Sequence, residues 1–329
     1  MTVTASQIFI ATITLSVLFG PLVTGAQQPG KVYRIGFLGA TSPVGYAPQV
    51  EAFRAGLRDF GYVEGRNLKI EFRWAEGNYA RLPGLAAELV RLKPDVLVTH
   101  AGAGTRAAKH ATTTIPIVFG VAGDAVALGL VENLARPGGN VTGSSFFFPE
   151  LNAKRLEVLK EAVPRVSRVG VLLNPDNPAN VATLRAMEEA ARSLKVRLQS
   201  VEVRRPTEFE GAFTTLMKGH VEALAVYDDA MFIAEAVRIA DLARSNRLPT
   251  IGFIEYAKAG GLLAFGVNFS DLWRGAARFV DKIFKGAQPA DLPVEQPTKF
   301  ELIVNLGAAK ALGLTISPSL LVRADRVIE

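Results

Sequence analysis

The stretch Tyr33-Arg-Ile-Gly-Phe-Leu-Gly-Ala40 and its second version, Ser167-Arg-Val-Gly-Val-Leu-Leu-Asn174, decide the fold of this sequence. Each is an apolar run of strand length, followed by a polar turn that contains proline and then by a helical pattern. Strands made almost entirely of apolar residues are typical of parallel sheets that are buried on both faces. Because the same strand–turn–helix unit occurs twice in the sequence, we predict two similar lobes.

Four further strand patterns follow in each half, in the same order. They cover 67–73, 94–100, 115–120 and 140–143 in the first half, and 196–202, 221–227, 248–253 and 262–266 in the second. Helical patterns lie between them. The first helix has four apolar residues on one face and a glycine at its expected C-terminal cap: Val50, Phe53, Leu57, Phe60 and Gly61. This alternation predicts an α/β fold with two doubly wound parallel-sheet lobes joined by a hinge.

Composition excludes several classes of function. The 329 residues include no cysteine, so disulfides, thiol nucleophiles, thiolate-bound metals and a lipid-anchored cysteine are ruled out. His100, His110 and His220 are not spaced as a metal-binding pair, and neither a metal nor another cofactor is expected. The net charge is 37 minus 31, or +6, but the basic residues are spread along the chain. We therefore expect no nucleic-acid partner.

The N-terminal segment has the composition of an export signal. Residues 1–30 contain no Asp, Glu, Lys or Arg, and an apolar run extends from Ile8 to Val23. The run is shorter than the roughly 20 residues of a membrane span, and small residues precede Ala26. We predict a signal peptide over 1–26 and a periplasmic protein that is not a lipoprotein. An uncleaved anchor or a buried helix stays an alternative, because the usual positive charge before the apolar run is missing.

The position of a ligand site follows from the predicted topology, because open parallel sheets bind ligands beside the carboxyl ends of their strands. The loops at these ends contribute the candidate ligand-binding residues. In the first half these are Thr41, Ser42, Tyr46, His100, Ala101, Gly102, Ala103, Gly104, Thr105, Gly123 and Asp124. In the second half they are Asn174, Asn177, Asn180, Tyr227, Asp228, Asp229, Phe253, Glu255 and Tyr256, with Phe147 between the halves.

The first-half loop 101–105 suits a carboxylate. Its small residues let a ligand approach the backbone, the following helix N-terminus presents free N–H groups, and Thr105 adds a hydroxyl. A tight turn that needs glycine is the alternative reading. The pattern Gly102-x-Gly104-x-x-Ala107 resembles a dinucleotide fingerprint, but it follows the third strand and lacks a clear acidic partner, so no nicotinamide cofactor is expected. His100 is interpreted as a polar residue of the cleft wall or core.

The second-half loops offer carboxylates beside aromatic rings. Tyr227-Asp228-Asp229 can hold a ligand ammonium, although one of the two acids can instead cap a helix. Residues 253–256 repeat the combination of ring and acid. Asn177 or Asn180 is either a ligand contact or a helix cap. Of the three rings at 146–148, one is expected in the cleft, and burial between the lobes is the alternative.

No catalytic device is recognisable in the sequence. It contains no Gly-x-Ser-x-Gly elbow, no phosphate loop that ends in Gly-Lys-Ser/Thr and no His-Glu-x-x-His. We therefore expect a binding protein and not an enzyme.

Several stretches carry a family resemblance. They are Gly61-Tyr-Val-Glu-Gly-Arg-Asn67, Glu71-Phe-Arg-Trp-Ala-Glu76, Ile115-Pro-Ile-Val-Phe119, Gly129-Leu-Val, Arg136-Pro-Gly-Gly-Asn-Val-Thr-Gly143, Asn305-Leu-Gly-Ala-Ala-Lys-Ala-Leu-Gly-Leu314, Pro318-Ser-Leu-Leu and Arg323-Ala-Asp-Arg. Over about residues 31 to 329 the chain resembles ABC-transporter substrate-binding proteins of the tryptophan/tyrosine-binding-like family. The resemblance implies a type I periplasmic binding protein fold, a ligand enclosed between two lobes, delivery to an ABC permease in the inner membrane, and no catalysis.

The resemblance also suggests roles for the loops. Some members of the family bind aromatic amino acids, and by analogy the 101–105 loop takes a carboxylate while Asp228 or Asp229 takes an amine. Some relatives have an Asp-Asn pair where this chain has two aspartates. The expected lobes are 31–145 plus 268–295 and 146–267 plus 296–329. We predict a monomeric periplasmic solute-binding component of an ABC importer that captures a small polar or aromatic, amino-acid-like solute by hinge closure. The alternative is a sensor that presents its closed form to a membrane receptor.

Overall fold

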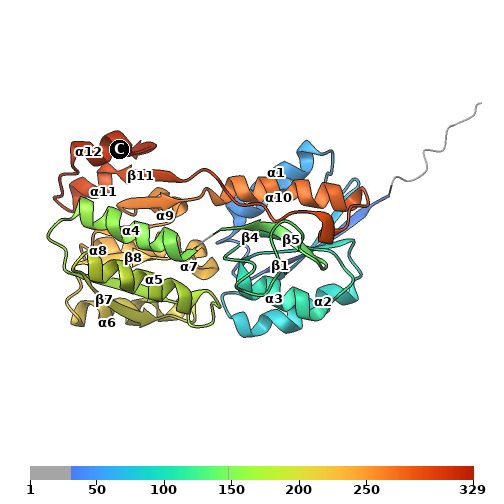
Figure 1. The fold of residues 1–329 in the computed structure, drawn as a ribbon, viewed down its shortest axis with the longest axis horizontal. Helices are drawn as coiled ribbons and strands as arrows, with labels where there is room; N and C mark the ends of the chain where they lie inside the picture. The colour runs from blue at the N-terminus through green and yellow to red at the C-terminus, as the bar shows by residue number, and fades with distance from the viewer. Residues whose placement is uncertain (1–30, 147) are drawn as a thin grey trace, which may run out of the picture. The chain divides into compact units, whose positions relative to one another are not determined.

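Two parallel sheets organise the chain (Figure 1). The computed structural model describes residues 31–146 and 148–329, so the expected signal peptide at 1–26 lies outside the described residues. The first sheet has the order β2-β1-β3-β4-β5, and all its strands are parallel. Its strands are β1 (Tyr33–Gly39), β2 (Leu68–Trp74), β3 (Val96–Thr99), β4 (Ile117–Ala122) and β5 (Val141–Ser145).

The second sheet has the order β12-β11-β10-β9-β8-β6-β7. Strands β6 to β10 are parallel, while β11 runs antiparallel to β10 and parallel to β12. The strands are β6 (Arg168–Leu173), β7 (Arg197–Glu202), β8 (Ala223–Val226), β9 (Thr250–Gly252), β10 (Leu263–Gly266), β11 (Glu301–Asn305) and β12 (Arg326–Ile328). The ten strands predicted from sequence are confirmed within two residues at each end.

Helices pack on both sheets. In the first lobe, α1 and α10 lie on one side of the sheet and α2 and α3 on the other (Figure 1). The helices of this lobe are α1 (Ala47–Asp59), α2 (Leu82–Arg91), α3 (Ala101–Ala111) and α10 (Phe269–Phe284), with short 3₁₀ turns η1 (Tyr79–Arg81) and η3 (Pro289–Asp291). Those of the second lobe are α4 (Phe148–Ala162), α5 (Asn180–Ser193), η2 (Pro206–Glu208), α6 (Phe209–Lys218), α7 (Ala230–Ala234), α8 (Ala236–Ser245), α9 (Ile254–Lys258), α11 (Leu306–Ala311) and α12 (Pro318–Arg323).

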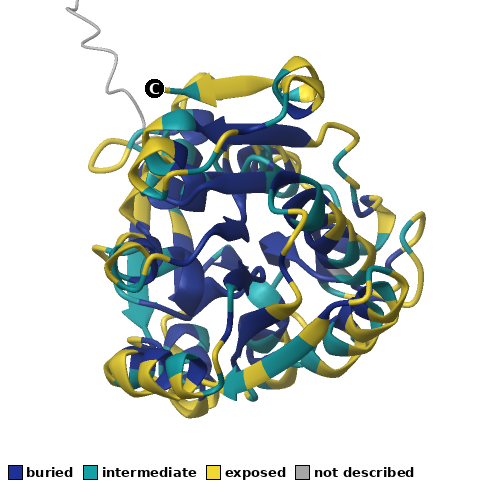
Figure 2. Cartoon of the chain, turned by 90° about the vertical axis from the view of Figure 1, so that its left-hand side faces the viewer, coloured by how far each residue is buried: buried dark blue, intermediate teal, exposed yellow. Residues whose placement is uncertain are grey.

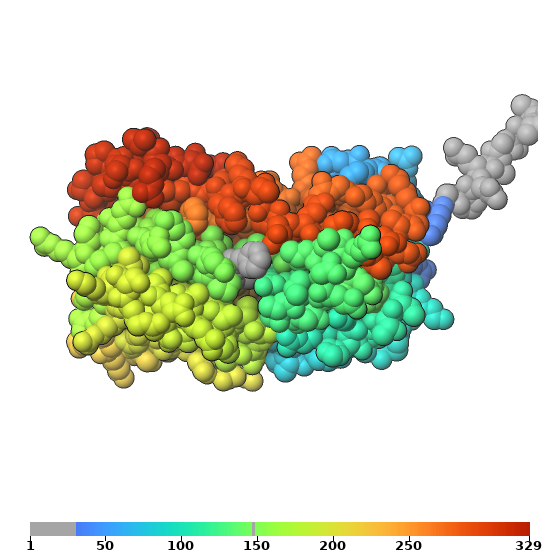
Figure 3. Space-filling view, viewed as in Figure 1, coloured from blue at the N-terminus to red at the C-terminus, as the bar shows by residue number. Residues whose placement is uncertain are grey.

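The chain passes between the two sheets more than once. It leaves the first sheet after β5, and α4 packs against β9 and β10 of the second. It returns from β10 to α10, which packs against α1 and β4, and then runs on to β11 in the second sheet. Figure 3 shows orange residues on the first lobe and the red C-terminal residues on the second. The residue limits of the lobes given above stay a prediction.

The interiors of the lobes follow the apolar pattern of the sequence. Most strands are buried, while the edge strands β7 and β12 and the outer faces of the helices are exposed or half-buried (Figure 2). On α1, Val50, Phe53 and Leu57 are buried as predicted. The prediction for Phe60 is wrong: this residue follows the last turn of α1 and its side chain is 42% exposed. Gly61 has a φ of +85°, as the predicted cap requires.

In the part of the chain that the structure describes, no helix combines the length and the apolar character that crossing a bilayer requires.

Candidate ligand-binding cleft

A small cavity of about 20 Å³ lies between loops of the two lobes. In this arrangement of the lobes the cavity has room for about one water molecule. The first lobe contributes the ends of β3 and β4 and the starts of α1 and α3, and the second contributes the loops after β6 and β8 and residues of α7. The lining residues are Tyr46, His100, Ala101, Gly102, Val121, Gly123, Leu128, Asn177, Ala179, Asp228, Ala230, Ile233 and Phe269.

His100 offers a hydrogen-bond donor in the cavity wall. Its Nε2 accepts from the backbone N–H of Ala40 at 3.0 Å, which assigns the ring proton to Nδ1. Burial lowers the pKa of His100 to about 3, so the ring is neutral at physiological pH. The side chain is 1% exposed, and Nδ1 has no hydrogen-bond partner among the described residues. A buried N–H without a partner is costly, and a ligand acceptor would satisfy it.

The N-terminus of α3 lies directly beside this histidine. Ala101 and Gly102 line the cavity, and the first N–H groups of an α-helix have no partner within the helix. Ala101 has a φ of +58°, a left-handed conformation that a residue with a Cβ rarely adopts. Such backbone strain is often found at ligand sites. The hydroxyl of Thr105 does not extend this donor set, because it donates to the carbonyl of Ala101 at 2.8 Å within the helix.

Tyr46 covers His100. The two rings stack with centroids 4.1 Å apart and an interplanar angle of 18°. The Tyr46 hydroxyl accepts from Nε1 of Trp273 on α10 at 3.0 Å and keeps its own proton for another acceptor. Burial raises the pKa of Tyr46 well above its usual value, so the hydroxyl stays protonated. The stack therefore fixes the orientation of the imidazole at the cavity wall.

Asp228 lines the cavity from the second lobe, but its charge is already balanced. Arg155 on α4 donates Nη1 to Oδ2 at 2.7 Å and Nη2 to Oδ1 at 2.9 Å. Both side chains are 1% exposed. Arg155 also donates to Asn152 Oδ1 and to the carbonyl of Phe265. Asp228 keeps lone pairs for a further donor, yet the pair with Arg155 is electrically neutral.

Asp229 does not line the cavity, and its side chain caps a helix. Its carboxylate accepts from the backbone N–H of Met231, and so caps α7. It also accepts from the side chains of Asn174, Asn177 and Tyr79. Burial raises the pKa of Asp229 while these donors act in the opposite direction. Of the two alternatives that the sequence left open, the structure shows the helix cap for Asp229.

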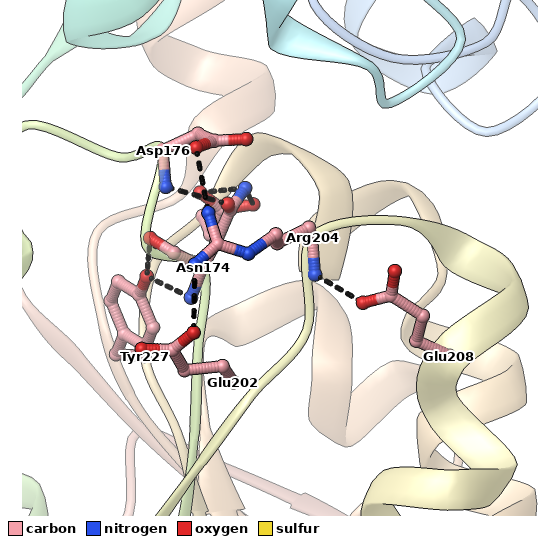
Figure 4. Close-up of polar contacts among 7 residues, drawn as sticks. Asn174, Asp176, Glu202, Arg204, Glu208 and Tyr227 are labelled. Atoms are coloured by element: carbon pink, nitrogen blue, oxygen red, sulfur yellow. Dashed lines mark hydrogen bonds and ion pairs between the residues drawn. The ribbon is translucent and has the colours of Figure 1, made fainter.

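The loop after β6 is held by Tyr227. The hydroxyl of Tyr227 accepts from the backbone N–H of Asn174 at 2.8 Å (Figure 4). The Oδ1 of Asn177 accepts from Ala179 N–H just before α5. Neither Asn177 nor Asn180 occupies the cap position of α5, which is Ala179, so the helix-cap alternative for these residues is not what the structure shows. Asn177 instead joins Asp229 to the cavity wall.

Glu255 is a second buried acid near the cavity. Its Oε1 accepts from the backbone N–H of the lining residue Phe269 at 3.2 Å. Its Oε2 is buried without a hydrogen-bond partner among the described residues. Burial raises the pKa of Glu255 to about 7, and the charge of Asp228 contributes to the increase. A cation brought near Glu255 would stabilise its ionised form.

The comparisons with known proteins identify the family of the chain. Residues 42–328 match the family described as ABC transporter substrate binding protein. The chain belongs to that family. It is also similar to a tyrosine-binding protein of Clostridioides difficile, with 27% identity over 265 residues, 80% of this chain and 76% of that protein. The two parallel-sheet lobes have the type I periplasmic binding protein fold.

Two solved structures of relatives differ in how well they superpose. The ABC domain from Streptococcus pneumoniae in complex with L-Trp is 26% identical, with a TM-score of 0.80 over 89% of this chain and 100% of that one. A ligand-free, open structure of a substrate-binding protein with adhesive properties from Clostridium difficile is also 26% identical. Its TM-score is 0.61 over 90% of this chain and 99% of that one.

Seven of the residues predicted from sequence line the cavity of this family member: Tyr46, His100, Ala101, Gly102, Gly123, Asn177 and Asp228. Others lie behind the wall in supporting roles. Ser42 and Asp124 accept backbone N–H groups within their own turns. The remaining predicted residues also lie outside the lining set: Thr41, Ala103, Gly104, Thr105, Asn174, Asn180, Tyr227, Asp229, Phe253, Glu255 and Tyr256. Phe147 lies outside the described residues.

Sequence reasoning missed the supporting residues Arg155 and Tyr79 and six residues of the lining: Val121, Leu128, Ala179, Ala230, Ile233 and Phe269. Arg155 carried a signal, because Leu151 and Leu159 stand four residues to either side and are buried on the same helix face. An arginine on such a face requires a buried partner. No sequence pattern singled out Phe269 or Tyr79. Among the described residues, no group of three His, Asp or Glu side chains is arranged to hold a metal ion.

Proposed function

We propose that the protein is the solute-binding component of an ABC importer and that its cleft captures an aromatic amino acid as the zwitterion. The observation that carries this proposal is the polarity of the cavity wall. The first lobe presents donors at His100 and at the N-terminus of α3, while the second presents Asp228 in the wall and Glu255 behind it, bonded to the lining residue Phe269. A zwitterion has an acceptor at one end and a donor at the other.

The ligand carboxylate belongs on the first lobe. It would accept from His100 Nδ1 and from the free N–H groups at the start of α3. The helix dipole adds a partial positive charge at the same place. Because His100 is neutral, this half of the site should bind equally well over the physiological pH range.

The ligand ammonium belongs on the second lobe, with Glu255 as its charged partner and Asp228 as a further acceptor. Asp228 alone is a weak choice, because Arg155 already balances its charge with two hydrogen bonds. Glu255 has one oxygen free and a pKa of about 7, so it can ionise when a cation arrives. Asp229 does not contact the ligand in this proposal.

The ligand side chain belongs against the apolar part of the wall, formed by Val121, Leu128, Ile233 and Phe269. An aromatic ring gains both from burial and from the contact with Phe269. The relatives support this class of ligand, since one is a tyrosine-binding protein and another was solved in complex with L-Trp.

Family membership and the position of the cleft support a role in transport. We propose that a ligand that touches both lobes favours the closed arrangement, and that the closed monomer then delivers it to an ABC permease in the inner membrane. The protein would be exported to the periplasm with its signal peptide cleaved after Ala26, and it would release the ligand unchanged. N-terminal sequencing of the protein recovered from the periplasm tests the cleavage site, and Gln27 is expected first.

Thermal unfolding against a panel of compounds tests the function. The panel contains aromatic, aliphatic and acidic amino acids, aromatic acids without an amine, and sugars. A ligand at about 100 times its dissociation constant stabilises the folded state by roughly 2.7 kcal/mol. Stabilisation by L-tyrosine, L-tryptophan or L-phenylalanine supports the proposal. Stabilisation only by sugars or by acids without an amine would refute the amino-acid assignment.

A further inference from the structure

One hydrogen bond joins the lobes without involving the cavity wall. Tyr79, in η1 of the first lobe, donates its hydroxyl to Oδ1 of Asp229 in the second lobe at 3.1 Å. The side chains are buried, with Tyr79 6% and Asp229 2% exposed. Neither residue is among those that line the cavity. This contact therefore links the lobes independently of what the cavity holds.

Hydrogen-bond donors of the second lobe fix the position of the Asp229 carboxylate. The side chains of Asn174 and Asn177 and the N–H of Met231 hold the carboxylate in place. When the lobes part, Asp229 keeps these three donors and loses only the tyrosine. Tyr79 loses its buried acceptor. The interaction can therefore break and reform without leaving a buried charge unpaired.

The lobes also approach closely at two glycines outside the cavity wall. A Cβ on Gly45 of the first lobe would lie 2.6 Å from Cβ and 2.9 Å from the carbonyl oxygen of Ala234 in α7. Gly77, with a φ of +76°, lies where a Cβ would be 3.1 Å from Cδ of Pro206. A side chain at Gly45 would force the lobes apart, because the backbone of Ala234 cannot move as a flexible side chain can.

We infer that Tyr79 is a positioning residue for ligand capture: its hydrogen bond to Asp229, together with the close contact at Gly45, is a latch that stabilises the closed lobes. The inference rests on the function proposed above, in which ligand affinity depends on closure. Apparent affinity is scaled by the fraction of molecules in the binding-competent state. The latch raises that fraction and slows ligand release without touching the ligand.

The experiment compares Tyr79→Phe with a matched control, Tyr62→Phe. Tyr62 also donates its hydroxyl to an aspartate, Asp281 at 3.0 Å, but both partners belong to the first lobe. A second pair of variants is Gly45→Ala and Gly84→Ala. Gly84 lies in α2, and a Cβ there meets no atom within 4 Å. The two tyrosine variants remove the same hydroxyl, and the two glycine variants add the same methyl group. The members of each pair differ in whether the lobes meet at the substituted residue.

Two readouts are needed. The first is the distance between spin labels on Arg106→Cys in α3 and Glu189→Cys in α5, which are exposed positions on different lobes. Because the chain contains no cysteine, these labels are the only ones introduced. The second readout is the dissociation constant for L-tyrosine and L-tryptophan from calorimetry, with release rates from stopped-flow fluorescence.

The latch predicts that Tyr79→Phe and Gly45→Ala lengthen the inter-lobe distance without ligand, while Tyr62→Phe and Gly84→Ala leave it unchanged. Affinity should weaken about tenfold in Tyr79→Phe, mainly through faster release. Unchanged distance distributions in both Tyr79→Phe and Gly45→Ala would overturn the inference. If neither amino acid binds the parent protein, the proposed function fails, and the distances without ligand still decide the latch.

Discussion

Replacing Arg155 by methionine should destabilise the protein more than any exposed charge deletion. The guanidinium makes two bonds to Asp228, one to Asn152 and one to the carbonyl of Phe265, at 2.7 to 3.0 Å. Both charged side chains are 1% exposed. Removing one partner of such a pair leaves an uncompensated buried charge and costs about 3–5 kcal/mol. We expect Arg155→Met to lower the free energy of unfolding by that amount.

The matched control is Arg238→Met. Arg238 also makes a bidentate contact with a carboxylate, that of Glu210, but the two side chains are 36% and 57% exposed. Exposed pairs contribute about 0–1 kcal/mol because water and salt screen them. The same change of residue type should therefore have a much smaller effect at position 238.

A double-mutant cycle isolates the interaction. The variants are Arg155→Met, Asp228→Leu and the two combined, with the free energy of unfolding taken from urea denaturation. The double variant should be less destabilised than the sum of the single ones by several kcal/mol, because neither charge is left alone. The reasoning is refuted if Arg155→Met costs no more than Arg238→Met, or if the single effects simply add.

Three further predictions concern the cleft. Burial raises the pKa of Glu255 to about 7 from 4.5, so ionisation of this side chain favours the unfolded chain. The free energy of unfolding should therefore fall as pH rises from about 4.5 through 7, by at most about 3 kcal/mol. Glu255→Gln should remove this fall in urea titrations, and calorimetry in two buffers should show release of about one proton when the parent binds an amino acid at pH 6. His100→Leu should weaken ligand binding at least tenfold and leave the N–H of Ala40 without an acceptor. His100→Gln retains both an acceptor and a donor, so it should lose less ligand affinity. Equal losses of affinity in the two variants would argue against the donor role of Nδ1. Ala101→Gly should stabilise the fold by up to about 1 kcal/mol in chemical denaturation, because φ is +58° there; a loss of stability would show that this backbone is not strained.

The strands were predictable because their signal is local. Each buried parallel strand is a short apolar run, and the repetition of runs across the two halves fixed their order along the chain. The predicted loops at the strand ends contributed seven of the cavity residues for the same reason. The two C-terminal strands β11 and β12 were not predicted, since they follow the repeated units.

The roles of individual acids were not predictable, because they depend on partners far away in the sequence. Asp228 and Asp229 are adjacent, yet one pairs with Arg155, 73 residues before it, and the other with Tyr79, 150 residues before it. Both partners come from elements whose packing no local pattern reveals. Glu255 is distinguished from them only by its free oxygen, which is a property of the folded state.

Calorimetric titration with three matched compounds tests the central claim most directly. L-Tyrosine carries both the carboxylate and the ammonium, tyramine lacks the carboxylate, and 3-(4-hydroxyphenyl)propionate lacks the ammonium. The cleft described here predicts that L-tyrosine binds and that each of the other two binds at least tenfold more weakly, since each leaves a buried donor or acid without its partner. Binding of the propionate as tightly as L-tyrosine would contradict the pairing of a zwitterion between His100 and Glu255.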